Sequence, residues 1–86
     1  MEQKLVHVFT VIDGTSEELV DLIEIKAFDL KAFAEQFDAD LKTDPEMRER
    51  YSVGPDDVTF LEKTLERELP LDFKRFAYFI EAATKD

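Results

Sequence analysis

The sequence predicts an α+β fold in which an N-terminal antiparallel β-hairpin packs against about three C-terminal helices. Two observations support this prediction. Apolar and β-branched residues dominate positions 4–26, whereas from residue 29 apolar residues recur every three or four positions, as they do on one face of a helix. A chain of 86 residues is long enough for one hydrophobic core and too short for two. Residues 1–86 therefore form a single predicted domain.

The hairpin is expected to join strands at residues 4–12 and 18–26. The first of these segments is a run of β-branched and aromatic residues that suits a strand. Asp13 and Gly14 provide the turn, because glycine accepts a positive φ and aspartate can bond the backbone that follows it. The second apolar run then returns along the first strand as its partner.

A helix over residues 16–25 is the alternative for the second strand. Thr15 and Glu18 have the spacing of a capping box, and the apolar residues that follow fit helical periodicity. We favour the strand because residues 22–25 end in β-formers and because the first strand would otherwise have no partner.

The first predicted helix starts at Asp29, whose side chain can cap the free N–H groups of the first turn. Its buried stripe comprises Leu30, Phe33, Ala34, Phe37 and Leu41. Pro45 then interrupts the backbone, because proline has no N–H to donate inside a helix. Residues 45–50 are expected to form a short helical turn that leads to Tyr51.

Two further helices are expected after residue 54. Pro55 suits the first position of a helix, and Pro70 disfavours helical geometry at Leu69, where this helix should end. Its buried side is predicted to carry Val58, Leu61 and Leu65. Asp72 is the expected cap of the last helix. The inward side chains of that helix are predicted to be Phe73, Phe76, Ala77 and Ile80.

The composition disfavours several classes of function. The chain has 21 Asp and Glu residues against 11 Lys and Arg, and its net charge of −10 would repel nucleic-acid phosphates. The absence of cysteine excludes disulfides, thiol chemistry and cysteine-ligated zinc. No apolar run has the roughly 18–20 residues of a membrane span. We therefore expect a cytoplasmic protein that binds neither nucleic acid nor membranes directly.

The sequence gives no pattern typical of an enzyme. His7 is the only histidine and lies among apolar residues, where structural packing is its expected role. Two glycines are too few for a phosphate-binding loop. We expect no catalytic residue and no cofactor. Acidic residues alternate over positions 38–46 as in a calcium loop, but a lysine, Lys42, occupies the fifth position and no glycine the sixth, so no metal site is expected.

Most of the excess negative charge lies in one part of the sequence. Residues 13–46 contain eleven acidic and three basic residues, a net charge of −8, whereas residues 47–86 have a net charge of −2. Exposed carboxylates of this kind can attract a basic partner and accelerate its association. The predicted partner-binding residues are Asp13, Glu17, Glu18, Asp38, Asp40, Asp44 and Glu46, with Tyr51 as an aromatic anchor. The alternative is a solvated surface that serves solubility alone.

The order of these features resembles a known group of bacterial proteins. The turn at Asp13–Gly14, the helix entry at residues 28–30, the turn at residues 44–47 before Tyr51 and the closing segment at residues 72–79 are similar to the layout of small immunity proteins associated with polymorphic toxins. The resemblance implies a cytoplasmic inhibitor that performs no chemistry itself. It implies a basic toxin as partner, most simply a nuclease, whose active site or substrate groove the inhibitor covers.

Other functions remain open at this point. A phage-type DNA mimic or anti-defence protein would also be acidic, although its charges should spread over an elongated surface. A small adaptor or homo-oligomerising domain is a further alternative, since the sequence leaves the oligomeric state open. A small enzyme or metal-binding regulator would need a pocket that groups His7 with carboxylates.

Overall fold

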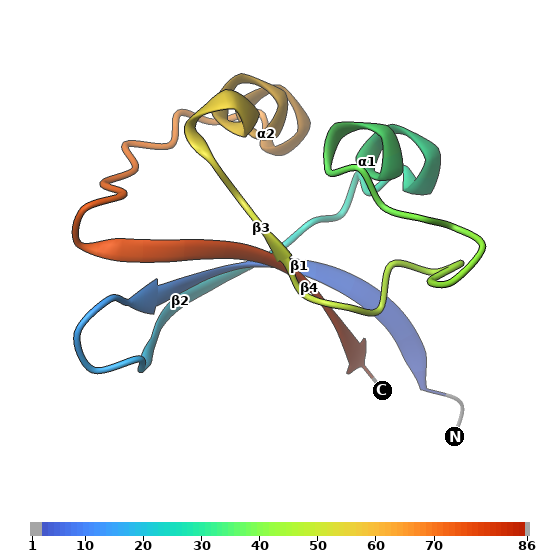
Figure 1. Ribbon diagram of the computed structural model, residues 1–86, viewed down its shortest axis with the longest axis horizontal. Coiled ribbons are helices and arrows are strands. Elements are labelled where there is room, and N and C mark those ends of the chain that lie inside the picture. The colour runs from blue at the N-terminus through green and yellow to red at the C-terminus, as the bar shows by residue number, and fades with distance from the viewer. Residues whose placement is uncertain (1–2, 86) are drawn as a thin grey trace.

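The fold is one four-stranded antiparallel sheet with two short helices on one of its faces (Figure 1). The computed structural model describes residues 3–85, and the strands follow the order β2-β1-β4-β3. In chain order the elements are β1 (Lys4–Asp13), β2 (Leu19–Glu24), α1 (Leu30–Gln36), β3 (Tyr51–Ser52), the 3₁₀ turn η1 (Pro55–Asp57), α2 (Val58–Leu65) and β4 (Phe76–Lys85).

The predicted N-terminal hairpin is confirmed. Strands β1 and β2 pair antiparallel, with Phe9 opposite Ile23 and Thr10 opposite Leu22. The alternative helix over residues 16–25 is wrong, because this segment forms the edge strand that extends β1 on one side.

The predicted set of three helices, and with it the predicted fold class, is wrong. Asp72 does organise one turn, since its backbone oxygen accepts bonds from the N–H groups of Arg75 (3.2 Å) and Phe76 (3.0 Å). The chain then extends as β4, which pairs with β1 from Lys4 opposite Lys85 to Asp13 opposite Phe76. A strand satisfies the second side of β1, which a helix here would leave without hydrogen bonds.

Helix α1 begins where the sequence predicts and ends earlier. The Asp29 carboxylate accepts a hydrogen bond from the N–H of Ala32 (3.2 Å), which confirms the cap. Asp38 then takes a left-handed conformation (φ 55°), and the N–H of Ala39 donates to the Ala34 oxygen (2.9 Å) in a helix-ending motif. Leu41, predicted to be buried in this helix, therefore lies beyond it and is exposed.

The second predicted helix is also confirmed at its start. Pro55 opens η1, and the Asp57 carboxylate accepts a bond from the N–H of Gly54 (2.9 Å). Helix α2 ends at Leu65 because Glu66 is left-handed (φ 54°), so the predicted end near Leu69 is too late. Of the helical turn predicted over residues 45–50, only a single turn at Pro45 and Glu46 is present, closed by the N–H of Met47, which donates to the Asp44 oxygen (3.2 Å).

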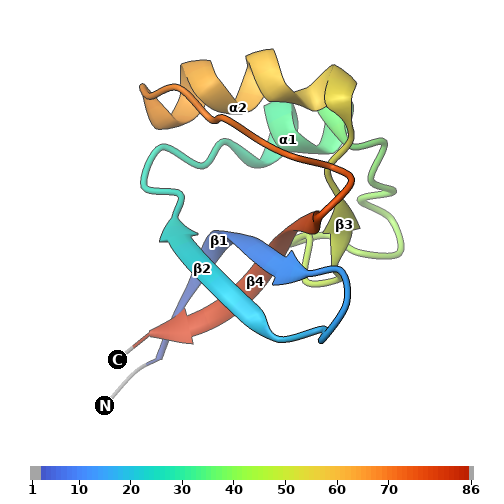
Figure 2. The same ribbon diagram turned by 90° about the vertical axis from the view of Figure 1, so that its left-hand side faces the viewer.

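The hydrophobic core lies between the sheet and the two helices (Figure 2). Phe33 of α1 contacts Phe60 of α2 edge to face, with ring centroids 4.9 Å apart. Phe9 of β1 stacks beside Tyr78 of β4 on the same side of the sheet. The largest fully buried side chains are Phe9, Phe33, Met47, Leu61 and Ile80.

Gly14 is needed for a close approach and not for a positive φ, which neither glycine adopts. The left-handed residue of the hairpin loop is Glu17 (φ 62°). The N–H of Gly14 donates to the backbone oxygen of Arg75 (2.9 Å), and a Cβ added at Gly14 would lie 2.9 Å from that oxygen. This contact holds the hairpin loop against the start of β4.

We expect Gly14→Ala to destabilise the protein by about 1–3 kcal/mol, the usual cost of forcing extra atoms into a filled site. The measurement is urea unfolding followed by circular dichroism. Gly54→Ala is the matched control, because the nearest atom to a Cβ added at Gly54 is an oxygen of the Asp57 side chain, 3.8 Å away. Equal stability losses for the two variants would contradict this role for Gly14.

Candidate interaction surface

One face of the sheet carries no helix. Both helices lie on the opposite side (Figures 1 and 2). Alternate residues of β1 point to the open face, among them Thr10, which lies between Leu22 of β2 and Phe79 of β4. An antiparallel sheet can leave one face to solvent, but such a face is normally polar. Here it contains Leu22 and Phe79, so it is a candidate surface for another molecule.

A row of polar contacts closes the middle of this open face. The hydroxyl of Thr10 donates to Glu81 Oε2 (2.7 Å), and Glu81 Oε1 lies 3.6 Å from Arg50 Nε. The Arg50 guanidinium lies over the Phe79 ring, 4.2 Å from its centroid. Thr10 is therefore only 3% exposed although no helix covers it. The middle of the face is shielded by its own side chains.

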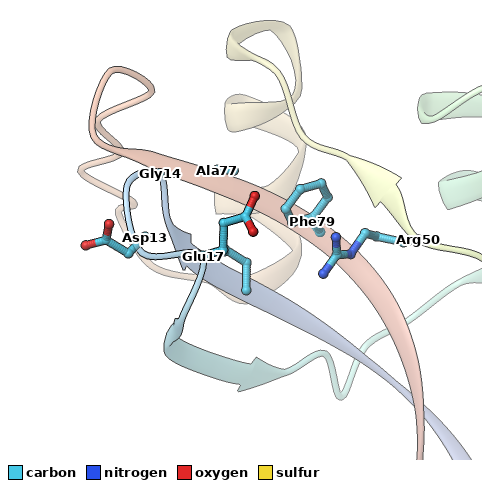
Figure 3. A pocket seen from close by; sticks show the side chains of 7 residues that line it. Asp13, Gly14, Glu17, Arg50, Ala77 and Phe79 are labelled. Carbon is cyan, nitrogen blue, oxygen red and sulfur yellow. The ribbon is translucent and has the colours of Figure 1, made fainter.

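A cavity of about 350 Å³ lies between this row and the hairpin loop (Figure 3). Its floor includes Ala77 and Phe79 of β4. Glu17 reaches over it from the hairpin loop and Arg50 from the other side, whereas Asp13 points away. The cavity thus has an apolar floor, with one acidic and one basic side chain at its sides.

Asp13 serves the hairpin loop itself. Its Oδ1 accepts bonds from the N–H groups of Thr15 (2.8 Å) and Ser16 (3.0 Å). These bonds, that from Ser16 first, hold the pKa of the Asp13 carboxyl below its ordinary value. Glu17 and Glu18 are exposed and form no ion pair with any residue in the range 3–85. They are the carboxylates of the loop that a partner can reach.

Strand β2, which follows this loop, has unusually exposed apolar side chains. Leu19, Val20 and Leu22 are 56%, 53% and 48% exposed. The strand is at the edge of the sheet, so its outer side has no neighbouring strand. Isolated apolar residues on a surface are common, but here three lie within four positions of an edge strand, so this edge is a second candidate surface.

The second predicted acidic segment lies elsewhere. Residues 38–46 are at the opposite end of the molecule from the hairpin loop (Figure 1), so the carboxylates predicted to bind a partner do not form one surface. Asp38 ends α1, the Asp40 carboxylate accepts a bond from the N–H of Lys42 (2.9 Å), and Glu46 pairs with Arg48 (3.1 Å). Arg48 thus pairs with a carboxylate of this segment, whereas Arg50 pairs with Glu81.

Asp44 is buried, which contradicts its expected exposure. Its carboxylate accepts bonds from the Tyr51 hydroxyl (2.6 Å) and from the N–H groups of Arg48 (2.8 Å) and Glu49 (3.1 Å). The Tyr51 bond is the main reason that the pKa of Asp44 is lowered, and burial with this contact raises the pKa of Tyr51 to about 12. Both groups organise the loop before β3 and present nothing to a partner.

His7 has the structural role that the sequence predicts. Its ring is buried and stacks on Phe28, with centroids 3.7 Å apart. Nε2 lies 3.0 Å from the Glu46 oxygen and 3.1 Å from the Met47 oxygen, and we assign the proton to this nitrogen because both partners are acceptors. The histidine ties the start of β1 to the loop around Asp44.

Within residues 3–85 no three metal-ligating side chains come together, including those of the acidic loop at 38–46. The helices of this range are all too short or too polar to cross a membrane.

Sequence reasoning missed the apolar edge of β2 and the pair formed by Arg50 and Phe79. The edge had a signal, since Leu19, Val20 and Leu22 stand among acidic residues in a segment read as a strand. The pair of Arg50 and Phe79 could not be predicted once residues 76–80 were assigned to a helix, because Phe79 lies on the open face only when this segment is strand β4.

A family model described as Domain of unknown function (DUF7683) matches residues 7–81. No curated protein and no solved structure matches the chain.

We expect Tyr51→Phe to raise the pKa of Asp44 toward its ordinary value of 3.8, because the phenol hydrogen bond is lost. A lowered folded-state pKa adds stability that is present above the unfolded-state value and disappears as the pH falls below it. The variant should therefore lose less stability than wild type on acidification below about pH 4. Carboxyl NMR titration and urea unfolding at several pH values measure both effects.

Tyr78→Phe is the control for this prediction, because the Tyr78 hydroxyl accepts a bond from the N–H of Asp72 and does not touch Asp44. An unchanged Asp44 pKa in Tyr51→Phe would show that the loop does not depend on the phenol contact.

Proposed function

We propose that this chain, which belongs to the family described as Domain of unknown function (DUF7683), is an acidic protein-binding inhibitor of the immunity type. In this proposal it acts in the cytoplasm and neutralises a basic toxin, most simply a nuclease, by covering its active site or substrate groove. It does so without performing chemistry. The proposal joins a net charge of −10 to an apolar surface that the fold leaves uncovered.

The observation that carries the proposal is the hairpin end of the sheet. Leu19 and Leu22 are exposed there beside Glu17 and Glu18, which have no ion-pair partner within residues 3–85. An apolar centre with a charged rim is the usual composition of a protein-binding surface. The sign of the rim selects a partner whose own rim carries lysine and arginine.

The two components of this surface have different effects on binding. Exposed carboxylates attract a basic protein over a distance of about 10 Å at moderate salt and so raise the association rate. Apolar side chains lose water only once the surfaces meet, and they slow dissociation. An inhibitor of a toxic enzyme needs both properties.

The proposed binding surface includes only some of the carboxylates that the sequence analysis named as partner-binding residues. Glu17 and Glu18 remain in it, whereas Asp13 and Asp44 are bonded within their own loops. Residues 38–46 lie at the far end of the molecule. Their separation also disfavours a DNA mimic, which needs evenly spaced charges along one surface.

The test requires that a basic toxin be encoded in a neighbouring gene, and it measures the growth of cells that express both proteins together with their affinity in vitro. We expect Glu17→Lys with Glu18→Lys to weaken binding about tenfold or more while the protein stays folded. Binding by wild type should fall between about 0.1 M and about 1 M salt.

Glu35→Lys with Asp38→Lys is the matched control, because it makes the same change in charge at the other end of the molecule, also on exposed residues. Full binding by the control together with loss in the hairpin variant would support the proposal. Equal loss in both would show that net charge alone acts, and full protection by the hairpin variant would refute the proposal.

A further inference from the structure

The outer edge of β2 has backbone groups that no other strand meets. Ile25 donates its N–H to the His7 oxygen (2.8 Å), so Ile25 faces β1. Because neighbouring residues of a strand direct their backbone groups to opposite sides, the N–H and C=O groups of Leu22 and Glu24 point away from β1. The edge is therefore open to another strand.

The opposite edge of the sheet differs. Strand β3 has only two residues, Tyr51 and Ser52, which pair with Ile80 and Phe79 of β4. Proteins protect sheet edges by making them short, by placing proline or lysine on them, or by covering them. Strand β2 has six residues, Leu19–Glu24, and includes neither proline nor lysine. Of the two edges, β2 is the one left available.

One outward N–H group of this edge already has a hydrogen-bond acceptor. The Asp21 carboxylate accepts a hydrogen bond from the outward N–H of Leu22, at 2.8 Å. An incoming strand must supply a carbonyl oxygen in its place, which releases the carboxylate. An unpaired carboxylate beside a new strand is stabilised when that strand carries a lysine or arginine close by.

The charges along β2 argue against a second copy of this chain. Glu17, Glu18 and Asp21 flank or lie in the strand and have no ion-pair partner within residues 3–85, whereas Glu24 pairs with Lys85 (3.0 Å). Two such strands side by side would place like charges opposite one another, which is destabilising. An extended segment rich in lysine or arginine meets the carboxylates of Glu17, Glu18 and Asp21 with opposite charge.

We propose that a basic, extended segment of the partner adds to the sheet beside β2 as a further antiparallel or parallel strand, with Asp21 selecting its charge. This inference rests on the proposed function, because it specifies how the hairpin end would hold a basic protein. Backbone bonds to Leu22 and Glu24 provide the affinity, and Leu19 and Leu22 contact the apolar side chains of the added strand.

The probe is a ten-residue peptide of alternating valine and lysine, with a valine and glutamate peptide of the same length for comparison. We expect the amide signals of Leu22 and Glu24 to shift on titration with the lysine peptide, and the glutamate peptide to bind at least about tenfold more weakly. Asp21→Asn keeps an acceptor for the Leu22 N–H but removes the charge, so it should reduce this discrimination.

Leu22→Pro removes the outward N–H without removing a bond to β1, and it should weaken peptide binding by about tenfold or more. Leu22→Val keeps that N–H and should bind within about threefold of wild type. The spectrum of β1 and β4 reports whether each variant is folded. If Leu22→Pro does not fold, the inference is tested by the amide shifts of the wild-type protein and by the peptide discrimination of Asp21→Asn.

Three results would overturn the inference: no shift at β2 up to about 1 mM peptide, equal binding of the two peptides, or a dimer paired through β2 in sedimentation and NMR. If Leu22→Pro still neutralises the basic partner while the charge-reversed hairpin variant does not, the added strand is wrong and the proposed function stands. If the peptide binds at β2 but the charge-reversed variant still neutralises the partner, the proposed function is the part that fails.

Discussion

The pairing of β1 with β4 is the interaction on which the rest of the structure depends. The first and last strands run side by side over their whole length, from Lys4 opposite Lys85 to Asp13 opposite Phe76. With β2 on its other side, β1 is central, and its backbone groups are satisfied in both directions. This pairing places β2 and β3 at the edges and fixes the side of the sheet on which α1 and α2 bury Phe9 and Ile80. Because the C-terminal segment forms strand β4 and not a helix, only α1 and α2 remain to cover the sheet, and both lie on the same face.

The two faces and the two edges of the sheet are thus unequal. The covered face has an aromatic core. The middle of the open face is shielded from solvent by Phe79 and Glu81 of β4 and by Arg50, which immediately precedes β3. The edge at β3 is too short to accept a strand. The edge at β2 is longer and flanked by acidic residues, and its leucines are exposed to solvent. Under the proposed function, these leucines contact the partner, and the acidic residues around them favour solubility of the free protein.

Local chemistry predicted the elements that depend on their own residues. The hairpin, the Asp29 cap and the start of the second helix at Pro55 follow from side chains within a few positions of one another. Strand β4 could not be found in this way, because Phe73, Phe76, Ala77 and Ile80 fit a helical stripe as well as Phe76, Tyr78 and Ile80 fit a strand. Only the need of β1 for a second partner decides between them. Helix ends at Asp38 and Glu66 were missed because a left-handed residue is expected to be glycine or asparagine. For the candidate site, the sequence identified the acidic residues of the loops. It could not show which of their carboxylates form hydrogen bonds inside the protein, as that of Asp44 does.

Hydrogen exchange of the isolated protein, followed residue by residue by NMR, tests the central claim most directly. If β1 is paired on both sides and β2 has a free outer edge, the amides of Val8 and Thr10 toward β4, and of Ile23 and Ile25 toward β1, should exchange slowly. The outward amide of Glu24, and that of Leu22, whose only acceptor is the exposed Asp21 carboxylate, should exchange far faster than those of Ile23 in β2 and Ile25 just after it. Equal protection of all four β2 and flanking amides would show that the edge is already covered. Fast exchange at Val8 and Thr10 would contradict the pairing with β4 on which the whole account is built.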